Sequence, residues 1–179
     1  MPEQTIRDAI DNVSKAVAAN PDKARVRNAS AVASLKGGLA FATTGPNGEA
    51  VVTDMPKAIG GGGGVPQPGW LLRAALASCT GTVIAMRAAK VGITLDKLVG
   101  ITLDKLEVNV DSQSDNRGML GLDENVSAAL IGLRTVVNVR ATNATHADLR
   151  TLVQWGDAHS PVACTLRSAL GANIEVVVE

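Results

Sequence analysis

Two thiols are the groups in this chain best suited to chemistry, and they lie in different surroundings. Cys79 falls in the middle of the apolar stretch 68–90. Burial there disfavours the reactive thiolate, and the alternative is a small apolar core residue. Cys164 follows a Ser-Pro pair typical of a helix start, and a helix N-terminus favours an anion. A core or interface role is again the alternative, while His159 could add positive charge nearby.

Other kinds of site have little support in the sequence. Two cysteines and two histidines lack the paired spacing that a zinc site needs. The five glycines Gly60–Gly64 precede Val-Pro-Gln, whereas a phosphate-binding loop requires Gly-Lys-Ser or Gly-Lys-Thr. Asp157, His159 and Ser160 are too close in the chain to adopt the geometry of a hydrolase triad. We therefore expect no metal and no cofactor, and the glycine run predicts a flexible loop.

Composition limits the choice of partner and compartment. The 179 residues include 17 basic and 17 acidic side chains with no run of like charge, so nucleic-acid binding is not expected. The N-terminal sequence lacks the pattern of a secretory signal, and two cysteines do not form a disulfide framework, which favours the cytoplasm. The stretch 68–90 approaches the length of a membrane span, but Arg73 and Arg87 make that interpretation costly.

Hydrophobic spacing and turn signals predict an α+β chain with antiparallel strand pairs. Thr145 and Asp148 fit a capping box at the start of a late helix. The only aromatic residues are Phe41, Trp70 and Trp155, so the core consists of small side chains, which weakly favours an oligomer. The expected elements are a helix over 6–17, a strand meander over 25–53 with a GPNG turn, a buried helix over 68–90, strands over 106–110 and 126–141, helices from Thr145 and Ser160, and a strand over 173–178.

A tandem repeat of eight residues follows the long helix. VGITLDKL occupies residues 91–98 and again 99–106, and the repeat does not continue. The second copy must be accommodated as a longer connection, a bulge or an extended strand. We interpret it as a duplication without functional meaning.

Three segments together resemble the OsmC-like proteins, a family that includes the organic hydroperoxide resistance proteins. The segments are PGWLLRAALASC at 68–79, DNRGMLGLDENV at 115–126 and HSPVACTL at 159–166. The resemblance extends over about residues 30–178. We therefore divide the chain into an N-terminal amphipathic extension, residues 1–24, and an OsmC-like domain, residues 25–179.

The resemblance implies a fold, an assembly and a reaction. The fold is α+β, with antiparallel sheets around long central buried helices, in an intertwined homodimer with two sites at its interface. In active members a cysteine on the central helix attacks a peroxide and becomes a sulfenic acid, and Cys79 matches that position. A second cysteine then forms a disulfide, which a dithiol reductant restores, while an arginine and a glutamate hold the thiolate ready.

This chain departs from that pattern at several positions. Ser160 stands where active members have the second cysteine, which leaves Cys164 as a displaced resolving thiol. Gly69 replaces the glutamate, and no arginine lies between Ala50 and Pro68, where Lys57 is the only cation. Arg25 and Arg27 lie further upstream. The candidate catalytic residues are Cys79, Cys164 and Lys57, and the candidate substrate-binding residues are Trp70, Ser160 and His159.

Two functions remain open from the sequence. One is a thiol-dependent reductase of organic hydroperoxides in oxidative stress defence. The other is a non-catalytic dimer of the same fold that binds an apolar or acyl ligand at its interface, which the missing arginine and glutamate favour.

Overall fold

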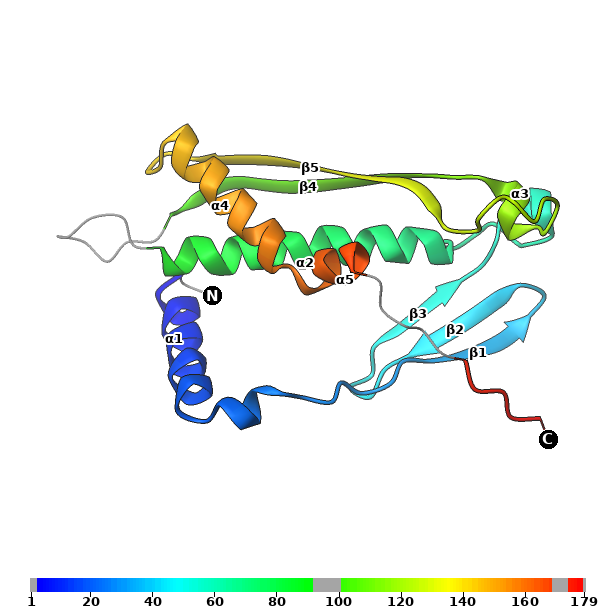
Figure 1. The fold of residues 1–179 in the computed structure, drawn as a ribbon, viewed down its shortest axis with the longest axis horizontal. Coiled ribbons are helices and arrows are strands. Elements are labelled where there is room, and N and C mark those ends of the chain that lie inside the picture. Colours follow the sequence, from blue (N-terminus) through cyan, green and yellow to red (C-terminus); the bar gives the residue numbers. More distant parts are fainter. Residues whose placement is uncertain (1–2, 92–100, 169–173, 179) are drawn as a thin grey trace. The chain divides into compact units, whose positions relative to one another are not determined.

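The computed structural model describes residues 3–91, 101–168 and 174–178, which form two compact units. One unit comprises Ala9–Ala75, and the other comprises Met1–Asp8 with Leu76–Glu179. The elements in chain order (Figure 1) are α1 (Glu3–Ala19), η1 (Pro21–Ala24), β1 (Val32–Gly37), β2 (Ala40–Thr44), β3 (Ala50–Thr53), η2 (Lys57–Ile59), α2 (Pro68–Lys90), β4 (Leu103–Ser114), α3 (Asn116–Met119), β5 (Leu130–Ala141), α4 (His146–His159) and α5 (Pro161–Arg167).

The unit Ala9–Ala75 contains a three-stranded antiparallel sheet in the order β1-β2-β3. The predicted hairpin is confirmed, because β2 and β3 pair with Phe41 opposite Thr53 and Thr44 opposite Ala50. Gly48 in the GPNG turn has a φ of +87°, a left-handed backbone that glycine adopts without steric cost.

The glycine run forms a loop, as predicted, and this loop packs against its own neighbouring residues. The run folds back over Asp54, which is only 9% exposed. The Gly62 amide donates to Asp54 Oδ2 at 2.7 Å, and the Gly63 amide donates to the Met55 carbonyl at 3.2 Å. A Cβ on Gly61 would overlap the Met55 carbonyl. The glycines are therefore explained by close backbone packing around a buried carboxylate.

This packing predicts different costs for two substitutions in the same run. Gly61→Ala should destabilise the protein by about 1–3 kcal/mol, because the loop must move away from Met55. Gly64→Ala is the matched control, since no atom lies within 4 Å of a Cβ built there. Urea denaturation of both variants measures the difference. Equal unfolding midpoints would contradict the packing described for the loop.

In the other unit, β4 and β5 form a long antiparallel ribbon with Val108 opposite Val137. The core lies between this ribbon and the helices: Ile84 and Ala88 from α2 pack with Leu149 and Leu152 from α4. Figure 1 shows α4 crossing α2 beside the ribbon. The strand predicted over 106–110 is longer in the structure, and the one predicted over 126–141 begins only at Leu130.

The repeat takes part in the start of β4. Most of the first copy, residues 92–98, lies outside the described residues, as do residues 99 and 100 of the second copy. Leu103–Leu106 of the second copy open β4, and the register shifts between Leu103 and Lys105. Of the three alternatives, the described residues show part of the second copy in an extended strand with an irregular register, and the connection itself lies outside the described residues.

Gly156 allows α4 to approach α2 closely. A Cβ at Gly156 would overlap Ile84 Cγ1 and would lie 3.3 Å from the Ile84 backbone, and Ile84 is fully buried. Such a short contact leaves no room for even a methyl group.

Gly156→Ala should therefore lower the free energy of unfolding by about 1–3 kcal/mol. The overlap must outweigh the gain in helix propensity of about 1 kcal/mol that alanine brings. Gly132→Ala in β5 is the control, because space around Gly132 is open. Thermal and urea unfolding should show a loss for Gly156→Ala alone, and a stabilised Gly156→Ala would refute the close crossing.

The long helix has the predicted bounds, but it is not buried on every side. Its buried positions Leu76, Thr80, Ile84 and Ala88 follow a spacing of four and form one stripe. Trp70 and Met86 on other faces are 50% and 42% exposed. By length and composition α2 could cross a membrane, a test that core helices also pass. Within a single chain, therefore, only one stripe of the apolar helix α2 is buried.

The N-terminal helix contacts the end of α2. Arg7 of α1 is buried, and its Nε donates to the Ala89 carbonyl at 2.9 Å. The last carbonyls of a helix have no partner within the helix, and a cation is favourable there. The division of the chain at residues 24 and 25 stays a prediction.

The expected final strand is not present. Residues 174–178 are extended chain outside any sheet, with Ile174 89% and Val178 88% exposed, and Asn173 lies outside the described residues. A strand needs a partner edge for its backbone hydrogen bonds, and this segment has none within the described part of the chain.

Candidate functional site

Cys79 lies in α2 beside a buried hydroxyl group. The Ser160 Oγ–H donates to Cys79 Sγ at 3.3 Å, across 81 positions of sequence. Ser160 is fully buried, whereas Cys79 is half-buried and keeps access to solvent. Both residues belong to the unit with Leu76–Glu179. The structure thus brings two of the candidate residues together.

Local helix signals place Ser160 at this point. Ser160 ends α4 and is the N-cap of α5, where Pro161 occupies the first turn. Its Oγ accepts a hydrogen bond from the Ala163 amide at 3.4 Å. The capping role fixes the hydroxyl in one orientation, so the helix junction directs it at the sulfur.

A third residue completes the hydrogen-bond chain. Thr80, 1% exposed, donates from Oγ1 to Ser160 Oγ at 3.2 Å, and Ser160 donates onward to Cys79 Sγ. Two hydroxyl groups in series therefore end at the sulfur, which accepts one hydrogen bond from Ser160. Sequence reasoning missed Thr80, although a hydroxyl next to the cysteine in an apolar helix was a usable signal.

Cys164 occupies a different environment. It is exposed on α5, its Sγ donates to the Ala158 carbonyl at 3.2 Å, and Arg167 Nη2 donates to Sγ at 3.8 Å. Arg167 also pairs with Asp157 at 3.0 Å. Its hydrogen bonds to Asp157, and secondarily to Cys164, raise the pKa of the guanidinium above its ordinary value. Both cysteines are free thiols.

Two of the remaining candidates lie in the other compact unit, and the third stacks on a tryptophan. Lys57 is exposed in η2, and Trp70 is half-exposed in the first turn of α2. Both belong to the unit Ala9–Ala75, so their roles stay predictions. The His159 ring stacks on Trp155 with centroids 3.9 Å apart, and its Nδ1 lies 2.8 Å from the Trp155 carbonyl.

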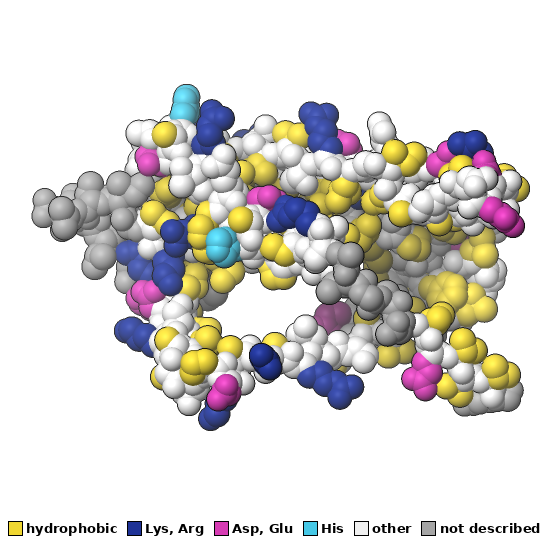
Figure 2. All heavy atoms as spheres, viewed as in Figure 1, with side chains coloured by type: hydrophobic (Ala, Val, Ile, Leu, Met, Phe, Trp, Pro, Cys, Tyr) yellow, Lys and Arg dark blue, Asp and Glu magenta, His cyan; other side chains and the backbone are white. Residues whose placement is uncertain are grey.

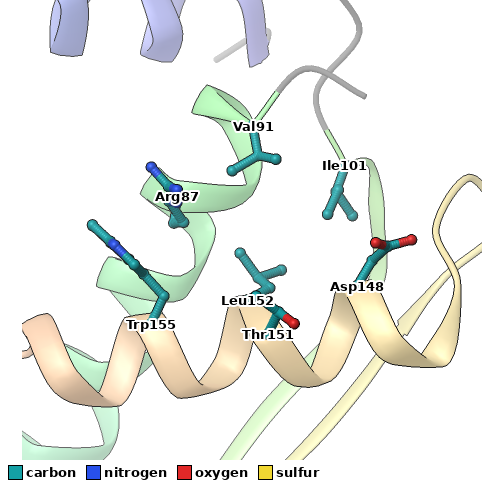
Figure 3. Close-up of a pocket in the computed structure, with 7 residues that line it drawn as sticks. All are labelled: Arg87, Val91, Ile101, Asp148, Thr151, Leu152 and Trp155. Atoms are coloured by element: carbon teal, nitrogen blue, oxygen red, sulfur yellow. The ribbon is translucent and has the colours of Figure 1, made fainter. Parts of the chain in front are cut away.

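A small cavity lies between α2 and α4 in the same unit as Cys79. Figure 3 shows the apolar side chains Val91, Ile101 and Leu152 around it, with Arg87 at one side. The cavity measures about 140 Å³, and the Arg87 guanidinium lies 4.5 Å from the centre of the Trp155 ring. These residues come from distant segments, so no sequence signal predicted the cavity. Among the described residues no group of His, Cys, Asp or Glu could hold a metal ion.

The fold and the thiol define a class of α+β proteins in which a long helix carries a half-buried cysteine beside a helix junction. Residues 61–175, more than half of the chain, match the family model described as OsmC-like protein. The chain therefore belongs to the OsmC-like family, which confirms the resemblance drawn from the sequence. No curated protein matches the chain in sequence.

Solved structures support the same fold. The OsmC-like protein of Mycoplasma pneumoniae is 15% identical with a TM-score of 0.64, covering 80% of this chain and 89% of its own. An organic hydroperoxide resistance protein of Legionella pneumophila is 18% identical with a TM-score of 0.56, and the match covers 79% of this chain and 92% of that protein. The organic hydroperoxide resistance protein OhrB of Bacillus subtilis is 20% identical with a TM-score of 0.52, and the match covers 80% of this chain and 93% of that protein. The predicted α+β fold with antiparallel sheets is confirmed.

Proposed function

We propose that this protein is a thiol-dependent reductase of organic hydroperoxides in oxidative stress defence, with Cys79 as the nucleophile. The observation that carries the proposal is the hydrogen bond of 3.3 Å from the buried Ser160 hydroxyl to the half-exposed Cys79 sulfur. Membership of the OsmC-like family and structural neighbours described as hydroperoxide resistance proteins support it.

The first step follows from thiol chemistry. The Cys79 thiolate attacks one oxygen of the hydroperoxide, a sulfur–oxygen bond forms and the oxygen–oxygen bond breaks. The departing alkoxide takes a proton to become an alcohol, and Cys79 becomes a sulfenic acid. The Ser160 hydroxyl stabilises the sulfur before attack and is 3.3 Å from the reacting atom. No bound cofactor is needed, and a thiol reductant returns Cys79 to its starting state.

A second copy of the chain is the proposed partner. A groove on α2 is lined by Ala77, Gly81 and Ala85 and by Leu106 and Val108 of β4. Figure 2 shows hydrophobic side chains exposed on the visible face, and several large ones are more than half exposed. Burying such surface between copies is favourable. Light scattering after size exclusion should report a homodimer. Two free thiols suit a reducing compartment, so we place the protein in the cytoplasm.

The experiment is the trapping of sulfenic acid. The purified protein is treated with one equivalent of cumene hydroperoxide in the presence of dimedone and digested with trypsin. Cleavage after arginine gives residues 74–87 with Cys79 and residues 151–167 with Cys164 as separate peptides. We expect dimedone on peptide 74–87 together with loss of the peroxide. Unmodified Cys79 with undiminished peroxide would refute the proposed function.

The cavity of Figure 3 favours a second candidate function, the binding of a small acyl ligand. Its volume of about 140 Å³ is close to that of an apolar cavity known to bind benzene. The Arg87 guanidinium suits a carboxylate, and Val91, Ile101 and Leu152 suit an apolar tail. Native mass spectrometry of freshly purified protein, beside Arg87→Met, tests this function. A bound mass lost in the variant supports it, and a clean apo protein that turns over hydroperoxide opposes it.

A further inference from the structure

We propose that a small monothiol from solution, and not a second cysteine of the chain, resolves the sulfenic acid formed on Cys79. This inference rests on the proposed function, because it concerns the step that follows peroxide reduction. It assigns the reductant a chemical class, a low-molecular-weight compound with one thiol. The argument uses the neighbours of the two cysteines.

The group nearest to Cys79 cannot form a disulfide. Ser160 Oγ lies 3.3 Å from Cys79 Sγ and is fully buried, so it occupies the place from which an internal thiol would attack. Thr80 and the Ala163 amide hold that hydroxyl at 3.2 and 3.4 Å. A sulfenic acid on Cys79 therefore meets a hydrogen-bond donor on this side and no thiol.

The other cysteine is held elsewhere. Cys164 Sγ donates to the Ala158 carbonyl at 3.2 Å on the exposed side of α5. Its backbone is fixed in the helix, since the Cys164 amide donates to the Ser160 carbonyl at 2.9 Å and its carbonyl accepts from the Ser168 amide at 3.1 Å. A disulfide needs Cβ atoms about 4 Å apart. Cys164 lies one turn beyond Ser160, a rise of about 6 Å, and its sulfur would have to leave the Ala158 carbonyl before it could pair with Cys79.

Part of the Cys79 side chain is open to solvent. The side chain is half-buried in the single chain, and Ser78 beside it lines the α2 groove proposed above as the contact with a second copy. A small thiol can therefore approach the sulfur, while a large protein reductant is not required. The Ser160 hydroxyl is placed to donate a hydrogen bond to the oxygen that leaves the sulfenic acid.

The chemistry balances with two molecules of monothiol. The first thiol attacks the sulfur of the sulfenic acid, a sulfur–sulfur bond forms, and the sulfur–oxygen bond breaks with release of water. The second thiol attacks the mixed disulfide, releases the free thiol of Cys79 and leaves as a small-molecule disulfide. Peroxide is reduced to alcohol and water, and two monothiols are oxidised.

Mass spectrometry of one oxidation cycle tests the inference. Parent protein, Cys164→Ser and Cys79→Ser receive one equivalent of cumene hydroperoxide, then 2-mercaptoethanol, and are digested without reduction. We expect 2-mercaptoethanol linked to peptide 74–87 as the main oxidised product, in the parent and in Cys164→Ser alike. Cys79→Ser should carry no such adduct on that peptide.

Two further results separate the possible failures. A disulfide joining peptides 74–87 and 151–167 in the parent, with the mixed disulfide confined to Cys164→Ser, would overturn the inference while dimedone trapping at Cys79 still supported the proposed function. Absence of both dimedone and 2-mercaptoethanol adducts at Cys79 would overturn the proposed function and this inference together.

Discussion

Cys79→Ser should lower the rate of hydroperoxide consumption by at least about 1000-fold, the scale of loss expected when a nucleophile is removed. A serine hydroxyl stays protonated at neutral pH and is a far weaker nucleophile than a thiolate. Serine is close to cysteine in size and can still hydrogen-bond to Ser160, so the fold should persist. Stopped-flow measurement of the loss of cumene hydroperoxide gives the rate, and circular dichroism checks the fold.

The control is the same substitution at the other thiol. In a single turnover Cys164→Ser should consume its first equivalent of peroxide as fast as the parent, because any resolving step comes afterwards. Cys164 contacts Ala158 and Arg167, not Cys79. Equal rates for Cys79→Ser and the parent would show that the peroxide is reduced somewhere else.

Ser160→Cys should give a protein that closes an internal disulfide with Cys79 on exposure to one equivalent of hydroperoxide. The introduced sulfur replaces an oxygen that lies 3.3 Å from Cys79 Sγ, and a disulfide bond is about 2.05 Å long, so a small rotation suffices. Intact mass should show the loss of two hydrogens, reversed by dithiothreitol. Peroxide turnover with a dithiol as the only reductant should rise above that of the parent.

Two controls isolate this effect. Thr165→Cys adds a thiol at an exposed position of α5 and should leave Cys79 outside any internal disulfide. Ser160→Ala removes the donor to Cys79 and the N-cap of α5 without adding a thiol, so it reports the cost of losing both. If Cys79 in the oxidised Ser160→Cys protein can still be alkylated, that result would contradict the described geometry of the site.

Local patterns predicted the elements that local forces determine. The proline at position 68 and the mainly apolar run after it predicted the bounds of α2, and the capping box of Thr145 and Asp148 forms as expected at the start of α4. The Ser-Pro pair begins α5 with Ser160 as its cap. Each of these signals acts within one turn of helix.

Features that depend on distant neighbours could not be predicted. The residue types of Gly60–Gly64 do not say whether the loop is packed, because its packing depends on a contact with Asp54, eight positions before Gly62. The burial of α2 was overestimated because apolar composition does not say which chain covers each face. The pairing of Cys79 with Ser160 joins positions 81 residues apart, and the family resemblance alone pointed to it.

The contact between Arg7 and Ala89 has a consequence for the newly synthesised chain. The two residues are 82 positions apart, so the N-terminal helix leaves the ribosome well before its docking partner exists. At about 5–20 residues per second the interval is roughly 4–16 s. During that time the Arg7 guanidinium has no acceptor at the end of α2. The hydrogen bond that ties the start of α1 to α2 can therefore form only after residue 89 has emerged from the ribosome.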